Sequence, residues 1–182
     1  KRLDITCNGN KTVCANFLPV DRTKFVNQTF PCFKLSGQPL QFVKEVRYLG
    51  HIVTDRLRDD TDIGRELRNM YIRINILIRR FSRCSLHVKL KLFKSYCLCF
   101  YGAALWSIYT NESLRKLKSC YHKCLKMFLG YPKFHSVTAI LFDTALPSFD
   151  TVIHNCRYRL RLQWTSSCNG IVVHLTSLGL VF

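Results

Sequence analysis

The sequence predicts an α+β protein: a short β-rich segment over residues 1–56, a mainly α-helical bundle over 57–168 and an apolar tail over 169–182. Two features of the sequence predict this class. Prolines and the Ser36–Gly37 pair interrupt the first segment repeatedly, so only short strands and hairpins fit there. From residue 59 onward, apolar residues recur at intervals of three and four, the period of an amphipathic helix. With 48% hydrophobic residues in a chain of 182, a buried core is expected.

Several short strands are expected before residue 57. Alternating apolar residues around Val13 and Phe17 predict one strand, and residues 31–53 contain two or three more. The last of them, "EVRYLGHIV", is expected to run as a strand to Thr54–Asp55 and there to give way to a helix. Gly50 lies within this stretch, where the absence of a side chain lets another group approach the backbone closely.

A long amphipathic helix is expected over residues 59–83. Asp59, Asp60 and Thr61 can cap its first turn, where acidic side chains also suit the positive end of the helix dipole. Its inward-facing side chains are expected to be Ile63, Leu67, Met70, Ile74, Leu77 and Phe81. This regular spacing makes the helix the clearest element of the chain.

Further helices are expected to complete a bundle of four or five. They are predicted over residues 85–109, 111–130, 136–145 and 148–164. The first of these is apolar nearly all round in its second half, so it should form the buried centre, with Val88, Leu92 and Tyr96 along its inner face. The next begins at an Asn111 cap and stops at Gly130.

The charge of the chain points to a polyanionic partner. There are 28 Lys and Arg against 11 Asp and Glu, a formal net charge of +17. Beyond Glu66 the sequence holds seventeen basic residues and three acidic ones, far more charge than solubility needs. Nucleic acid, bound without base specificity, is the first expected partner, with an anionic membrane surface second. No apolar run reaches the roughly 18 residues that span a bilayer, so no membrane-spanning helix is predicted. Of the two partners we therefore expect nucleic acid and no membrane.

Basic residues spaced along the predicted helices are the candidate phosphate contacts. We assign this role to Lys89, Lys91, Lys94, Lys116, Lys123 and Lys126. Tyr71, Tyr96, Tyr121 and Trp106 are aromatic side chains that can stack on bases or sugars, although most of them are expected in the core.

Ten cysteines suggest neither a disulfide scaffold nor a metal site. Their spacing is irregular, no signal peptide precedes them, and several lie in helical apolar patterns where cysteine acts as a small hydrophobe. Cys120 and Cys124 share a helix face, but His122 points away from them, and the Cys97–Cys99 spacing does not suit a zinc knuckle. We therefore expect a reducing compartment and no bound metal.

Three segments together resemble the C-terminal part of a reverse transcriptase from an animal non-LTR (LINE-type) retrotransposon. They are "GNKTVCANF", the run from "LQFVKEVRYLGHIV" through "DDTDIGRELRNMYIRINILIRRFS", and "VKLKLFKSYCLCFYGAALW" with "RKLKSCYHKCLKMFLGYPKF". The resemblance covers roughly residues 5–165 and is strongest over 45–130. A lone "YLG" is weak evidence for this family, but these segments in this order are strong evidence for it.

The resemblance implies roles for two groups of N-terminal residues. Lys11 matches a lysine that follows the catalytic hairpin, near the incoming nucleotide. Tyr48, Leu49, Gly50 and His51 match the primer grip, a β-hairpin that holds the 3′ end of the growing strand. By the same resemblance, residues 1–56 are the edge of the palm and residues from about 59 onward are the thumb.

The chain departs from the family where catalysis takes place. Polymerisation uses carboxylates that hold two divalent metals, two of them adjacent in a "[YF]-x-D-D" turn between strands. No such motif occurs here, and Asp59–Asp60 follows "RLR" and opens a helix. We therefore assign no catalytic residue and no cofactor to this chain, with Mg²⁺ expected only in the intact family enzyme. The absence of an initiator Met and the abrupt apolar end suggest a fragment whose missing polymerase segments lie elsewhere.

Three hypotheses remain open from the sequence. The chain is a reverse-transcriptase fragment that keeps a grip on template and primer, intracellular and either nuclear or cytoplasmic. Alternatively, it is a noncatalytic basic helical module that binds nucleic acid or a protein. The third hypothesis is a non-functional retrotransposon relic.

Overall fold

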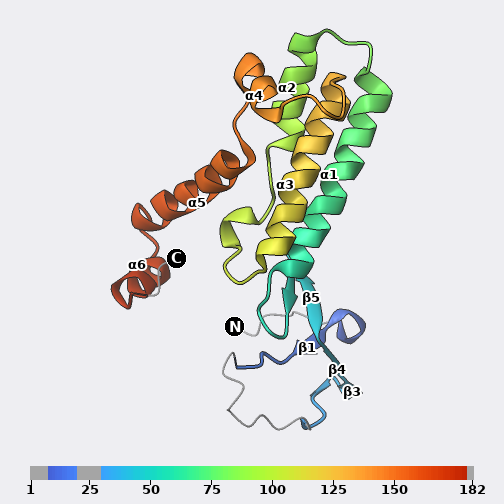
Figure 1. Cartoon of the computed structure of the whole chain (residues 1–182). Helices are drawn as coiled ribbons and strands as arrows, with labels where there is room; N and C mark the ends of the chain where they lie inside the picture. The colour runs from blue at the N-terminus through green and yellow to red at the C-terminus, as the bar shows by residue number, and fades with distance from the viewer. Residues whose placement is uncertain (1–7, 20–29, 180–182) are drawn as a thin grey trace. The chain divides into compact units, whose positions relative to one another are not determined.

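The computed structural model describes residues 8–19 and 30–179 and divides the chain into two compact units, Lys1–Asp62 and Ile63–Phe182. In the described residues all strands lie in the first unit, and the α-helices fall almost entirely in the second (Figure 1). The predicted α+β class, with N-terminal strands and a helical C-terminal part, is confirmed.

The N-terminal unit contains three two-stranded ladders. Its elements are η1 (Gly9–Lys11), β1 (Val13–Ala15), β2 (Lys34–Leu35), β3 (Gln38–Pro39), β4 (Gln41–Val43), β5 (Glu45–Tyr48) and β6 (His51–Thr54). β2 and β3 form a hairpin, as do β5 and β6, whereas β1 pairs in parallel with β4. The break predicted at Ser36–Gly37 is the β2–β3 turn, with both residues at positive φ, 51° and 82°.

One expectation for this unit is wrong. Residues 45–54 do not form one strand, because the chain reverses at Leu49–Gly50 and the two halves pair with each other. The strand expected around Val13 and Phe17 is present as β1, although Phe17 lies beyond its end and both side chains are exposed. A sheet of two strands offers little surface against which such residues can be buried.

The helical unit contains six α-helices and one 3₁₀ turn within its described residues. They are α1 (Asp60–Phe81), α2 (Leu86–Cys97), η2 (Ala103–Leu105), α3 (Asn111–Leu129), α4 (Val137–Thr144), α5 (Phe149–Thr165) and α6 (Gly170–Ser177). α6 lies in the segment predicted only as an apolar tail, and the Asn169 side chain caps it by accepting from the Ile171 amide. None of these helices combines the length and apolar character needed to cross a membrane.

The boundaries of α3 and α5 follow local capping chemistry. Thr110, and not the predicted Asn111, caps α3, because its side chain accepts a hydrogen bond from the Ser113 amide. Gly130 ends α3 at φ 81°, as predicted. Ser148 caps α5 by accepting from the Thr151 amide.

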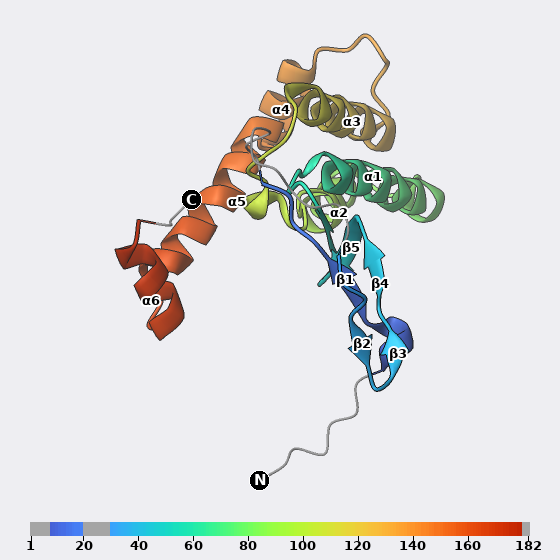
Figure 2. The same ribbon diagram turned by 90° about the horizontal axis from the view of Figure 1, so that it is seen from below.

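One apolar core joins α1, α2, α3, α4 and the start of α5. From α1 it takes Ile63, Met70, Ile74 and Leu77, with Leu67 and Phe81 packed against it, so the predicted face of this helix is confirmed. From α5 it takes only Phe149, Val152 and Ile153, the first turns, and the rest of α5 with α6 extends away from α1–α3 (Figures 1 and 2).

α2 differs from its prediction in length and in orientation. It ends at Cys97, well before residue 109, because Gly102 turns the chain at φ 82° into η2. The buried side chains of this region are Phe93, Cys97, Phe100, Ala103 and Trp106, whereas Val88, Tyr96 and Cys99 are exposed. The turn at Gly102 lets Phe100, Ala103 and Trp106 all reach the core, although they lie outside the regular helix.

A buried carboxylate lies in the helical core. Glu66 is fully buried on the inner face of α1, where it pairs with Arg65 at 3.2 Å and with Arg73 two turns later. Arg65 also donates to the backbone carbonyl of Tyr101 at 3.2 Å and lies over that residue's ring. The carboxylate thus holds two guanidinium groups, one of which ties α1 to the loop after α2.

Replacing Glu66 by alanine should destabilise the helical unit strongly. The change leaves two largely buried guanidinium groups without their carboxylate, which costs about 3 kcal/mol in free energy of unfolding. Urea unfolding followed by helical circular dichroism measures this loss. The control is Glu112→Ala, which removes a solvent-exposed pair with Lys116 and should change the stability little. Equal effects of the two substitutions would contradict the assignment.

Candidate nucleic-acid interface

The tip of the β5–β6 hairpin projects an apolar and an aromatic side chain into solvent. Tyr48 and His51 are the last paired residues, and Leu49 and Gly50 form a two-residue loop with φ of 47° and 83°. The Tyr48 and Leu49 residues are 66% and 74% exposed. Residues 48–51, assigned to a strand-end grip by resemblance, are therefore brought together at one tip.

Leu49 is an unusual residue for this loop. Hairpin turns with two positive φ values favour Asn-Gly or Asp-Gly, because a larger side chain clashes in the left-handed region. Holding leucine there costs on the order of 1–2 kcal/mol. A strained backbone that also exposes a large apolar side chain is a common feature of contact sites. Leu49 is therefore a strained and exposed apolar residue at the tip.

The strand that leaves the tip is held by the acidic start of α1, beside the turn itself. The Asp62 carboxylate, which is fully buried, accepts a hydrogen bond from the Ile52 amide at 3.0 Å. Its second oxygen lies 3.0 Å from Nδ1 of His51, within ion-pair distance but without hydrogen-bond geometry, and Asp59 lies 3.6 Å from Nε2. The imidazole is thus bracketed by two carboxylates, which orients the strand that leaves the tip.

This arrangement explains the acidic run that follows β6. The helix begins at Asp60, so the prediction that Asp59–Asp60 opens a helix is confirmed. Asp60 pairs with Arg58 through two nitrogens, at 3.0 and 2.9 Å. The sequence places Asp62 at the helix start, where its charge suits the helix dipole, but its contact with the Ile52 amide was not predicted, because that contact depends on the return of β6 toward the helix. The only sequence signal for this contact is an acidic residue in the first turn of a helix that follows a hairpin with a glycine in its loop.

Lys11 and the α2 lysines are accessible. Lys11 ends the turn η1, exposed, and its amide donates to the Asn8 carbonyl at 3.1 Å. On α2, Lys91 and Lys94 are exposed and one turn apart, so they share a face, while Lys89 is half-buried. The lysines of α2 are therefore available to phosphates.

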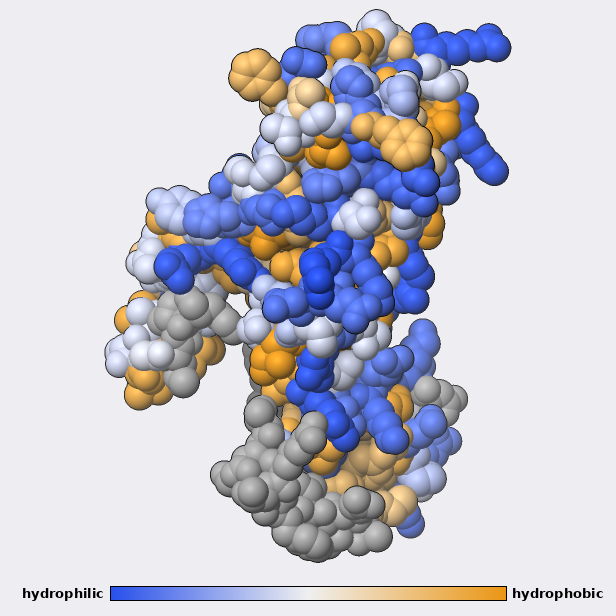
Figure 3. All heavy atoms as spheres, in the orientation of Figure 1, coloured by the Kyte–Doolittle hydropathy of each residue, from blue (hydrophilic) through white to orange (hydrophobic). Residues whose placement is uncertain are grey.

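The α3 lysines are each held by a neighbour. Lys116 pairs with Glu112 at 2.7 Å, and this contact lowers the pKa of that carboxyl. Lys123 lies 6.0 Å from the centre of the Tyr71 ring, and Lys126 donates to the Lys133 carbonyl at 2.8 Å. Lys116 and Lys123, two turns apart, share one exposed face. Figure 3 shows hydrophilic side chains over much of the visible helical unit, with hydrophobic ones between them.

The aromatic candidates separate into core and surface. Tyr121 is fully buried and donates to the Pro147 carbonyl at 2.8 Å, and Trp106 is buried as well. Burial raises the pKa of Tyr71 to about 12. Of the four, only Tyr96 is well exposed, so the expectation that most of these rings belong to the core is confirmed.

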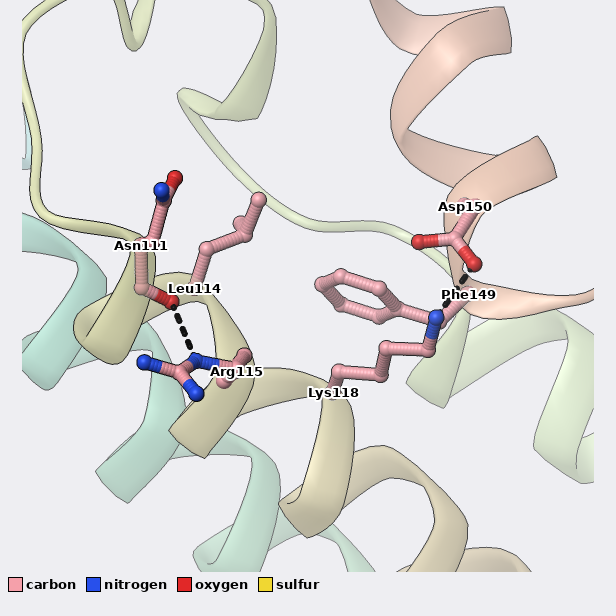
Figure 4. Close-up of a pocket in the computed structure, with 6 residues that line it drawn as sticks. All are labelled: Asn111, Leu114, Arg115, Lys118, Phe149 and Asp150. Carbon is pink, nitrogen blue, oxygen red and sulfur yellow. Dashed lines mark hydrogen bonds and ion pairs between the residues drawn. The ribbon is translucent and has the colours of Figure 1, made fainter.

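A pocket of about 470 Å³ lies between the start of α3 and the start of α5. Arg115 and Lys118 line it, with Phe149 and Asp150 from α5 (Figure 4). Asp150 holds the Lys118 ammonium at 2.5 Å, and Arg115 donates to the Asn111 carbonyl at 3.4 Å. Because the carboxylate compensates one of the two cations, this pocket is a poor site for phosphate.

The buried cysteines behave as packing groups. The sulfurs of Cys120 and Cys124 lie 3.8 Å apart, and the S–H of Cys120 faces the Leu67 carbonyl at 3.9 Å. The Cys120 contact and burial raise the pKa of Cys124, and burial raises that of Cys97 to about 12, so both thiols stay protonated. Within residues 8–19 and 30–179, no three His, Cys, Asp or Glu side chains form a group that could hold a metal ion.

Comparison with known proteins gives no relative for this chain: no family model, no curated protein and no solved structure matches it. Its candidate sites therefore rest on its own residues.

Replacing Asp62 by alanine should loosen the hairpin. The Ile52 amide would lose its buried acceptor, a loss of about 1–3 kcal/mol in local opening free energy, or roughly 5- to 150-fold in amide exchange. Hydrogen exchange of residues 51–54 measures it. The control Glu45→Ala removes an exposed carboxylate from β5 and should leave that protection unchanged. Unchanged protection in the Asp62 variant would show that the carboxylate does not anchor the hairpin.

The stability of the helical unit should fall in mild acid because of His122. Burial lowers the pKa of His122 from its ordinary 6.5, and the neighbouring Lys118 and Lys126 lower it further. Since the folded pKa lies below the unfolded one, the unfolded chain binds more protons as pH drops through about 6.5. The free energy of unfolding should thus be constant above pH 7 and decline below it. His122→Gln should reduce that decline, while the exposed His87→Gln should retain it.

Proposed function

We propose that this chain holds nucleic acid through its phosphate backbone, as the palm-edge and thumb segment of a non-LTR reverse transcriptase, and that it carries no catalysis itself. The observation that carries the proposal is the anchored β5–β6 hairpin. Its tip exposes Tyr48 and Leu49, while Asp62 holds the adjoining residues His51 and Ile52. A strand end needs a firm, protruding contact of this kind, and the resemblance assigns the primer grip to these same residues.

The charge of the helical unit supports the same proposal. Exposed lysines on α2 and α3 present cations on regular helix faces, and the chain carries a net charge of +17. Neutralising phosphates with such side chains releases counterions, which gives sequence-independent affinity that depends strongly on salt. Interfaces of this type position a strand without reading its bases.

The described carboxylates do not fit the two-metal chemistry of an intact polymerase. Asp59 and Asp62 bracket His51, Asp60 pairs with Arg58, and Glu66 is enclosed by arginines. These side chains make structural contacts and belong to a helix start or a helix core. The Mg²⁺ of the family enzyme therefore has no ligand set among these four side chains.

Removing four exposed or accessible cations should weaken binding and flatten its salt dependence. We choose Lys91, Lys94, Lys116 and Lys123, each replaced by glutamine in one variant. If these side chains bind phosphates, the slope of log affinity against log salt should fall by about three to four, because each duplex phosphate left without its lysine reduces the slope by about 0.9. Fluorescence anisotropy with a labelled primer–template duplex, at several salt concentrations, measures it.

The matched control replaces the same four lysines by arginine, which keeps the charge and should keep the slope. Added Mg²⁺ and deoxynucleotides should give no primer extension by either variant or by the parent chain. A slope that stays the same in the glutamine variant would contradict the lysine assignment, and extension by the purified parent would contradict the noncatalytic role.

A further inference from the structure

A second cavity of the helical unit, also about 470 Å³, lies between the η2 segment and α5. Its walls are mostly aromatic and basic, and none of its lining residues is acidic. The lining includes both tryptophans of the chain, Trp106 and Trp164, together with Tyr109, His154, Arg157 and Tyr158. This volume lies in the range of sites for small organic ligands.

Arg157 forms the charged wall of this groove. Its guanidinium donates to the Tyr109 hydroxyl at 2.6 Å and to the Trp106 carbonyl at 3.3 Å, and it lies 5.7 Å from the centre of the Tyr109 ring. Among the described residues no carboxylate lies within ion-pair distance of it. Its position is therefore fixed while its charge stays available to a ligand anion.

Tyr158 and His154 supply stacking faces from α5, the same helix that carries Arg157. One helical turn separates them, and their rings are nearly parallel, 11° apart, with centroids 6.3 Å apart. The Tyr158 residue is 54% exposed, so a flat ligand can reach its face. A planar aromatic group with an attached anion fits this groove. Its ring system can stack on Tyr158 and His154, and Arg157 can bind its phosphate.

We propose that this groove binds an unpaired nucleotide of single-stranded nucleic acid, with its base on the Tyr158–His154 face and its phosphate at Arg157. This inference rests on the proposed function, since it assigns one subsite of a chain that holds nucleic acid. It adds a preference for strands that carry bases. Contacts to the phosphates of the nucleic acid do not give this preference, because they are the same for strands with and without bases. The pocket beside Asp150 lacks these features, since its one ring belongs to the buried Phe149 and a carboxylate faces its cations.

The test uses the full chain, a thymidine oligonucleotide and an abasic oligonucleotide of the same length. Because both tryptophans line the groove, intrinsic tryptophan emission reports on it directly. Emission should be quenched by the thymidine oligonucleotide and not by the abasic one, which should bind more weakly. Tyr158→Leu should lower affinity for the thymidine oligonucleotide about tenfold, with affinity for the abasic one unchanged.

Two control variants separate stacking from structure. Tyr158→Phe keeps the ring and should keep affinity, and Phe142→Leu removes an aromatic side chain that is 87% exposed and lies outside the groove. Equal affinity of the parent for the two oligonucleotides, or no effect of Tyr158→Leu, would overturn the groove assignment and leave the proposed function standing. Failure of the parent to bind either oligonucleotide or a duplex would overturn both.

Discussion

The contact on which the candidate interface depends is the burial of the Asp62 carboxylate against the strand that leaves the hairpin. A fully buried carboxylate is costly unless its oxygens find partners, and here they find the Ile52 amide and the His51 ring. An isolated two-stranded hairpin is only marginally stable in water. Because Asp62 belongs to the first turn of α1, the hairpin gains the rigidity of a helix start. Its tip can then hold Leu49 in a strained backbone conformation, exposed to solvent.

The helical unit uses its charges in two ways. Buried charges are enclosed and structural, as at Glu66, where two arginines meet one carboxylate within the core. Exposed charges are nearly all cationic, and those on helices lie mainly on α1, α2, α3 and α5. Arg157 shares a feature with each group. The Trp106 carbonyl and the Tyr109 hydroxyl fix its position, and no carboxylate of the described residues pairs with its charge. A surface of this kind suits a polyanion held by many weak contacts, and the groove that we propose for an unpaired nucleotide would add a preference for unpaired bases.

The elements that could be predicted from the sequence are those determined by residues close to one another in the chain. The period of α1 is regular and one-sided, so its inner face could be predicted residue by residue. The face of α2 could not, because apolar residues surround its second half and periodicity does not choose among them. The hairpin was missed from the residues alone since Leu49–Gly50 lacks the Asn or Asp that usually marks such a turn. Asp62 and the α5 groove depend on distant segments: Trp106 and Arg157, which meet there, are 51 residues apart.

The central claim is that the anchored tip meets nucleic acid directly. Site-specific photo-crosslinking tests this most directly: a benzophenone side chain replaces Tyr48, and the chain is irradiated with a primer–template whose 3′ end is labelled. We expect crosslinks to the strand end at low salt that disappear at high salt, with none from the same probe placed at exposed Phe134. Binding of the duplex without any crosslink from position 48 would contradict the claim.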